Sequence, residues 1–287
     1  MRRMTVGINF GSKIVIGVIA MVVIMGLGAA LFSPSNEYLF GTGPDSDPDP
    51  YLVHLVKAQN AESCSDSSCK DDVLNHYKMA LEINPEGRGA LDGILSTLIE
   101  LHNFDEAYTY YQTLSKLYPD RNFVETFYAV PLFLGLKQYD HALNSSDAYL
   151  EKIQEDKSEF TVQYALALRD KARSLIGLER YDESIAVIEE SYYLDPSGNT
   201  LVYKGVALSK QEKYHDALKV FDMSKKNGGG GLLLSLEQGI ALWNVGRYDE
   251  AKDILDNIES SNPESYGFLE CEVLSARKEL QNLVNSS

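Results

Sequence analysis

A short pattern of apolar and polar positions recurs along the chain and predicts helices at regular intervals. Each copy has an aromatic residue, two polar residues and a small residue, followed by apolar residues at the spacing of an amphipathic helix. Successive copies lie 34, 35, 42, 33 and 34 residues apart. A period of this length predicts stacked helical units, since each unit buries its apolar face against its neighbours. The small positions are Val73 in a weaker first copy, then Ala107, Ala142, Ser184, Ala217 and Ala251.

This pattern resembles the tetratricopeptide repeat, a helix–turn–helix unit of about 34 residues. The resemblance covers Tyr51 to Pro263, and small residues such as Gly205 and Ala217 would let paired helices approach closely. It implies an all-α superhelical solenoid of about six repeats over residues 51–263. Acidic residues suit the start of the second helices as caps, and prolines suit their ends. These residues are Asp105, Asp140, Asp182 and Asp249, and Pro85, Pro119, Pro196 and Pro263. The best copy, the sixth, has Gly239, Leu242, Tyr248, Ala251, Leu255, Ile258 and Pro263.

Interruptions of the pattern predict local departures from a regular stack. The long fourth interval, around residues 151–160, predicts lengthened helices, because apolar periodicity continues beyond it. Pro131 falls inside a first helix and predicts a kink. Leu95 and Val130 replace small residues, so the helices there should lie further apart. The glycines at 228–231 predict a flexible joint, and residues 264–287 predict an amphipathic capping helix and tail.

The N-terminal region predicts a membrane anchor. Residues 14–32 form a run of 19 residues without a charge, which as a helix spans about 28 Å. Arg2, Arg3 and Lys13 precede the run and acidic residues follow it, so residues 1–13 should form a cytoplasmic tail and the solenoid should lie outside the membrane. Residues 33–50, rich in Pro, Gly, Ser and Asp, predict a linker. The alternative is a signal peptide cleaved after Ala30.

The net charge limits the kinds of partner that the chain can bind, and the cysteines indicate a disulfide and no metal site. The net charge of −16 disfavours nucleic acid, whose phosphates would be repelled. Cys64 and Cys69 lie in a polar loop that the anchor would place in an oxidising compartment, so we predict a local disulfide. A metal site is not predicted, since no further Cys or His completes a ligand set. Cys271 is interpreted as a small buried apolar residue.

The sequence contains no recognisable catalytic arrangement. Its five histidines are scattered, and it has no nucleophile-elbow, phosphate-loop or zinc-protease motif. We therefore expect a protein that is not an enzyme and has no cofactor or small-molecule substrate.

The family resemblance implies a protein-binding groove on the concave side, lined by the first helices. The residues there are mostly apolar, which predicts an amphipathic helix or peptide as the partner, with Arg169 and Arg173 receiving an acidic residue. An alternative for several of these side chains is packing between neighbouring repeats. The predicted groove residues are Phe127, Leu134, Arg169, Arg173, Val202, Val206, Leu236, Ile240 and Trp243.

Together these features favour a membrane-anchored adaptor or scaffold whose solenoid binds a protein partner on the extracytoplasmic side. A secreted or periplasm-like holdase that shields hydrophobic segments is the alternative. The two differ in whether the N-terminal segment is retained, because cleavage would release the solenoid from the membrane.

Overall fold

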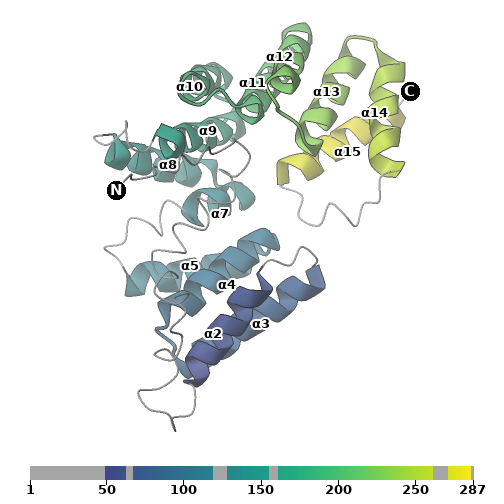
Figure 1. The fold of residues 1–287 in the computed structure, drawn as a ribbon. Helices are drawn as coiled ribbons and strands as arrows, with labels where there is room; N and C mark the ends of the chain where they lie inside the picture. Colours follow the sequence, from purple (N-terminus) through teal and green to yellow (C-terminus); the bar gives the residue numbers. More distant parts are fainter. Residues whose placement is uncertain (1–48, 63–66, 119–127, 155–160, 261–270, 286–287) are drawn as a thin grey trace, which may run out of the picture.

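The computed structural model describes residues 49–62, 67–118, 128–154, 161–260 and 271–285. Within these ranges the fold is all-α, with 13 helices and no strand (Figure 1). The helices are α2 (Pro50–Ala61), α3 (Ser67–Ile83), α4 (Arg88–Glu100), α5 (Phe104–Leu117), α7 (Val130–Gly135), α8 (Tyr139–Ile153), α9 (Thr161–Gly177), α10 (Tyr181–Leu194), α11 (Gly198–Lys210), α12 (Tyr214–Lys226), α13 (Leu232–Asn244), α14 (Tyr248–Ser260) and α15 (Cys271–Asn285).

Twelve of these helices pair into six consecutive hairpins, from α2–α3 to α13–α14, and confirm the predicted helical solenoid. Each hairpin packs against its neighbours in sequence. The stack curls, so that α13 and α15 face back toward α4 (Figure 1). The first helices of the hairpins, α4, α7, α9, α11 and α13, contribute residues to the inner side of this curl.

Five turns between paired helices share one backbone geometry. The residue before the cap of the second helix has a positive φ: 56° at His102, 57° at Lys137, 60° at Glu179, 61° at Glu212 and 82° at Gly246. The next residue donates its N–H to the carbonyl five positions earlier, as Asn103 does to Leu98 over 2.9 Å. This bond satisfies a carbonyl that the end of the first helix leaves without an intrahelical partner.

Glycine positions set how closely the helices pack. A Cβ atom at Gly205 would lie 2.2 Å from the ring of Phe221 in the paired helix α12. A Cβ atom at Gly93 would lie 2.3 Å from the Tyr77 ring of the preceding hairpin. The close approach expected to be lost at Leu95 is therefore made two residues earlier, at Gly93, and Leu95 is fully buried.

The four glycines at 228–231, where the sequence predicted a flexible joint, form a hydrogen-bonded turn. Gly229 donates its N–H to the Ser224 carbonyl over 2.8 Å, and the Ser224 hydroxyl donates to the Gly198 carbonyl over 2.7 Å. A Cβ atom at Gly198 would lie 2.2 Å from the Gly229 nitrogen. Glycine is needed here because two backbones touch and because Gly228 and Gly231 have φ values of 77° and 95°.

Other local predictions are refined. Helices α8 and α9 have 15 and 17 residues, longer than the 13 of α11 to α14, and residues 155–160 between them lie outside the described ranges. Pro131 occupies the first turn of α7, where its missing N–H costs little, and residues 119–127 before it are not described. Asp105 and Asp182 lie within the first turn instead of at the cap, so they act on the helix dipole.

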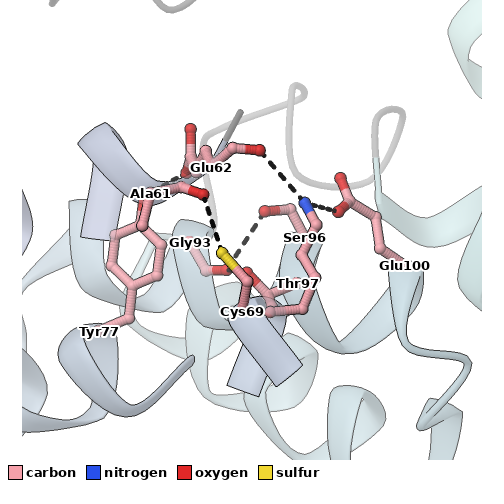
Figure 2. A network of polar contacts seen from close by, with 9 residues as sticks. Ala61, Glu62, Cys69, Tyr77, Gly93, Ser96, Thr97 and Glu100 are labelled. Carbon is pink, nitrogen blue, oxygen red and sulfur yellow. Dashed lines mark hydrogen bonds and ion pairs between the residues drawn. The ribbon is translucent and has the colours of Figure 1, made fainter. Parts of the chain in front are cut away.

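A polar network joins the first hairpin to the second (Figure 2). The Lys70 ammonium group lies 2.6 Å from the Glu100 carboxylate of α4 and 3.5 Å from the Glu62 carbonyl. The Tyr77 hydroxyl donates to the Glu62 carboxylate. Burial raises the pKa of Glu62, although the bond from Tyr77 opposes the shift, and burial also raises the pKa of Tyr77.

The predicted disulfide and anchor fall partly or wholly outside the described residues. Cys69 is disulfide-bonded, so its sulfur, 3.8 Å from the Ala61 carbonyl, has no S–H to donate. Cys64 is not described, and its pairing with Cys69 stays a prediction. Residues 1–48, with the predicted anchor at 14–32, are also not described. Within the described ranges, no helix is both long and apolar enough to cross a membrane.

The last helix, α15, does not extend the stack. It packs mainly on α13 and contacts α14 little, whereas α11 and α13 pack on the second helix of the preceding hairpin more than on its first helix. Its Ser275, Ala276 and Glu279 border the same inner pocket as residues of α4 and α9. Helix α15 therefore packs on the last hairpin mainly through its first helix, beside the pocket, and its role as a cap stays a prediction.

Candidate protein-binding groove

The inner side of the curl contains a pocket of about 420 Å³. Five first helices contribute to it, together with the adjoining turns and the start of two second helices, and α15 closes one end. The lining residues are Ile99, Glu100, His102, Phe104, Pro131, Leu134, Gly135, Lys137, Tyr139, Arg173, Ile176, Gly177, Tyr203, Val206, Lys210, Leu233, Glu237, Ser275, Ala276 and Glu279. A pocket that crosses five hairpins suits an extended or helical segment of another protein.

Arg173 and Tyr203 form the centre of the pocket wall. The guanidinium carbon of Arg173 lies 5.4 Å from the centroid of the Tyr203 ring, within the range of a cation–π contact. Arg173 also lies 3.4 Å from the Asp170 carboxylate, which Arg169 approaches to 3.3 Å. Both guanidinium groups therefore lie against the carboxylate of Asp170, and of the two arginines it is Arg173 that lines the pocket.

Lys210 marks the end of the pocket near the C-terminus. Its ammonium group lies 2.8 Å from the Glu279 carboxylate of α15. Burial alone would lower the pKa of Lys210, but the hydrogen bond to Glu279 and the charges of Glu237 and Glu279 outweigh it, so the pKa is raised. Lys210 therefore stays protonated at neutral pH and holds an acidic side chain at this position.

Aromatic residues at hairpin turns line the opposite end. A Cβ atom at Gly135 would lie 2.3 Å from the ring of Phe104, and one at Gly177 would lie 2.3 Å from the ring of Tyr139. Each ring belongs to the second helix of one hairpin and covers a glycine in the first helix of the next. His102 stacks on Phe104 with ring centroids 5.4 Å apart, and burial lowers its pKa. These contacts between a ring and a glycine join successive hairpins beside the pocket.

The predicted groove residues fall into three groups. Leu134, Arg173 and Val206 line the pocket, and their part in binding a protein stays a prediction. Val202, Leu236 and Ile240 are at most 4 % exposed and pack in the core between helices, so their predicted facing is corrected. Arg169, which does not line the pocket, pairs with Asp170, and half-buried Trp243 contacts the Tyr248 ring at 4.8 Å within its own hairpin. Phe127 lies outside the described residues.

Several pocket residues were missed by the sequence analysis. Tyr203 and Lys210 lie three positions before and four positions after Val206, so the helical stripe through Val206 could have identified both. Choosing Val202 instead shifted the stripe toward the core. Lys137, at the turn between α7 and α8, is a further basic residue that lines the pocket. Glu279 could not have been found, because α15 lies outside the repeat period.

Metal binding has no support in the described part of the chain, where no group of three or more His, Cys, Asp or Glu side chains is arranged to hold an ion. His54 and His76 meet as a pair, with their Nδ1 atoms 3.3 Å apart, and one ring can donate to the other. This contact joins α2 to α3 within the first hairpin.

Comparisons with known proteins agree with the helical-hairpin fold. Residues 170–197, covering the end of α9 and all of α10, match the family model described as "Tetratricopeptide repeat". A search of curated proteins finds no match. Among solved structures, a tetratricopeptide repeat protein from Parabacteroides merdae is similar, with 17 % identity, 94 % of this chain and 95 % of that chain covered, and a TM-score of 0.65.

Two further solved structures share the fold. PilW, described as a widely conserved type IV pilus biogenesis factor, has 12 % identity over 78 % of this chain and 97 % of its own, with a TM-score of 0.58. Pseudomonas aeruginosa pilF has 13 % identity over 81 % of this chain and 97 % of its own, with a TM-score of 0.51. At these identities the likeness shows the fold alone.

Proposed function

We propose that this chain is a scaffold that binds a protein partner in its inner groove. The observation that carries the proposal is the pocket itself, which crosses five hairpins and combines Leu134 and Val206 with Arg173, Tyr203 and Lys210. A site of this shape and mixed chemistry suits an amphipathic helix or peptide that presents both apolar and acidic side chains. The match of residues 170–197 to the tetratricopeptide repeat supports this class of function.

The proposed scaffold is anchored in a membrane by residues 14–32, with the solenoid on the extracytoplasmic side. The charge-free run and the basic residues before it support this placement. The holdase alternative has less support, because shielding hydrophobic segments calls for a broad apolar surface and this pocket carries several charged side chains.

Photo-crosslinking from the pocket tests the binding proposal. A photoreactive amino acid replaces Tyr203 in the full chain in native membranes, and a second chain carries it at Tyr193, which is 84 % exposed on α10. We expect a discrete crosslinked partner from position 203 and none of the same mass from position 193. The same partner from both positions, or no protein from position 203, would contradict binding in the groove.

Substitutions of Arg173 and Tyr203 test the charged and the aromatic part of the proposed contact with the partner. We expect Arg173→Ala and Tyr203→Ala to lower partner capture at least about tenfold each, since buried Arg and Tyr residues dominate many interfaces. Tyr193→Ala is the matched control and should leave capture unchanged. Circular dichroism must show the same helix content in all three variants for the comparison to hold.

The proposed membrane topology of the chain can be tested separately from partner binding. The mass of the mature chain distinguishes retention of residues 14–32 from cleavage after Ala30. Protease added to spheroplasts should digest a retained chain, because the solenoid would face outward. A mature chain that lacks the first thirty residues would support the secreted holdase, and full protection from protease would exclude the extracytoplasmic placement.

A further inference from the structure

The position of α15 differs from that of every helix that continues the stack. Helix α13 packs on α12, the second helix of the preceding hairpin, and helix α11 packs on α10 in the same way. A helix that extended the array would therefore pack mainly on α14. Helix α15 instead packs mainly on α13, on the side that borders the pocket. It occupies the place where a solenoid of this kind would hold a bound helix.

Helix α15 leaves a polar face of α14 exposed. Four residues on α14, Lys252, Asp253, Asp256 and Asn257, have exposed side chains. A terminal repeat with a polar outer face stays soluble without a helix over that face. The apolar residues of α15 instead join the buried cluster that contains Leu236 and Ile240 of α13.

The contacts of α15 are those of an amphipathic helix in a groove. Val273, Ala276 and Leu280 follow one another at spacings of three and four residues and are at most 7 % exposed. Leu280 lies over Gly239 of α13, where an added Cβ atom would come within 2.7 Å of a leucine methyl group. The missing side chain at position 239 thus makes room for the leucine.

A charged contact orients the helix. Glu279 of α15 lies 2.8 Å from Lys210 of α11, so α15 bridges the first helices of two successive hairpins. An apolar stripe with one acidic anchor is complementary to the basic and apolar side chains that the rest of the pocket offers at Arg173 and Val206. Ser275, Ala276 and Glu279 are the residues of α15 that line the pocket.

We propose that the inner face of α13 and α11 is a binding site for amphipathic helices, occupied in the free protein by α15. The partner's helix would carry a valine-sized residue, a small residue and a leucine at the spacing of Val273, Ala276 and Leu280, with an acidic residue for Lys210, and it would bind by displacing α15. This proposal deepens the proposed function and rests on it, because it names the kind of segment that the groove takes.

Peptide exchange into the full chain tests this inference. A protease site is introduced within residues 261–270, the folded chain is cut there, and all segments stay present. A fluorescent synthetic peptide of residues 271–285 with Cys271→Ser is then added, and its anisotropy is followed. We expect the peptide to replace the resident α15 segment in a saturable manner.

Variant peptides separate specific from unspecific binding. Leu280→Ala should weaken binding at least about tenfold, because the leucine fills the space over Gly239. Asn282→Ala, at an exposed position, is the matched control and should bind like the parent peptide. Glu279→Lys should also weaken binding, and the cut chain with Lys210→Glu should restore it.

Two results would overturn the inference. One is failure of the parent peptide to exchange under conditions in which the cut chain stays folded, which would make α15 a permanent part of the core. The other is equal binding of the parent and Leu280→Ala peptides. If Tyr203 still captures a partner in either case, the proposed function stands without this inference. If the peptide exchanges but no partner is captured, the helix site stands without the proposed scaffold role.

Discussion

A residue in the left-handed conformation ends the first helix of five hairpins, and only one of the five is glycine. His102, Lys137, Glu179 and Glu212 have φ values between 56° and 61°, whereas Gly246 has a φ of 82°. A side chain in this region costs free energy because Cβ approaches the following carbonyl. The hydrogen bond made by the next residue, as from Lys213 to Leu208, holds this geometry in the turn.

Replacing one of these residues with glycine should stabilise the protein. Glu212→Gly removes the strain but also makes the unfolded chain more flexible, so we expect a net gain of about 0.5–1 kcal/mol in the free energy of unfolding. Glu212 is exposed, and its side chain adds little packing. Urea denaturation followed by circular dichroism measures the change.

Lys252→Gly is the control for this prediction. Lys252 is exposed within α14, where glycine lowers stability by about 1 kcal/mol through helix propensity alone. Opposite signs for the two glycine variants would establish that backbone conformation decides the effect. A loss of stability in Glu212→Gly would mean that the turn is not strained.

Sequence reasoning has limited reach at this scale, because four of these five turns have a residue other than glycine at the position with a positive φ. Glycine at that position would have indicated the left-handed conformation. Glu179 and Glu212 read as ordinary exposed residues. The groove shows a related limit. Both Val202 and Val206 were predicted to line the groove, but of the two only Val206 lines the pocket. Residues four positions apart on one helix both qualify as apolar, and packing decides which one faces the pocket.

At the scale of helices, close approach at glycine positions decides how each hairpin packs. Gly205 lies against Phe221 of its own hairpin, and Gly93 lies against Tyr77 of the preceding one. The period of the small residues correctly predicted the hairpins, since this constraint is local and repeats. The turn at 228–231 was predicted as a free joint because its contacts with Gly198 come from a segment thirty residues away, which no local pattern reports.

Adding one methyl group at a packed glycine should cost more than alanine's helix propensity returns. In Gly205→Ala, the new Cβ would lie 2.2 Å from Phe221, so the ring must move. Alanine gains about 1 kcal/mol in propensity, and overpacking costs more, so we expect a net loss of about 1–2 kcal/mol. Thermal and urea unfolding of the full chain would measure it.

Gly230→Ala is the matched control because it adds the same methyl group where no atom lies within 4 Å. We expect it to change the free energy of unfolding by less than about 1 kcal/mol. If Gly205→Ala is as stable as Gly230→Ala, the two helices are able to separate at no cost and the close approach does not determine the packing.

At the scale of the whole molecule, the buried side chains divide into two large clusters with smaller ones between. One cluster includes Leu98 and Leu114 of the second hairpin, and the other includes Phe221 and Leu255 near the C-terminus. The clusters that contain Phe133 and Leu150 in the middle are smaller. In a solenoid each hairpin is stabilised by its neighbours only, so the two ends should open independently.

Hydrogen exchange can test this independence. Leu98 is fully buried, and Leu98→Ala should lower the free energy of opening in α4 and α5 by about 2–5 kcal/mol. Amides in α13 and α14 should keep their protection, because Leu98 belongs to the first cluster and the buried apolar residues of α13 and α14 belong to the second. The mirror variant Leu255→Ala should affect α13 and α14 and spare α4 and α5. Equal loss of protection at both ends in either variant would show that the chain unfolds as one cooperative unit.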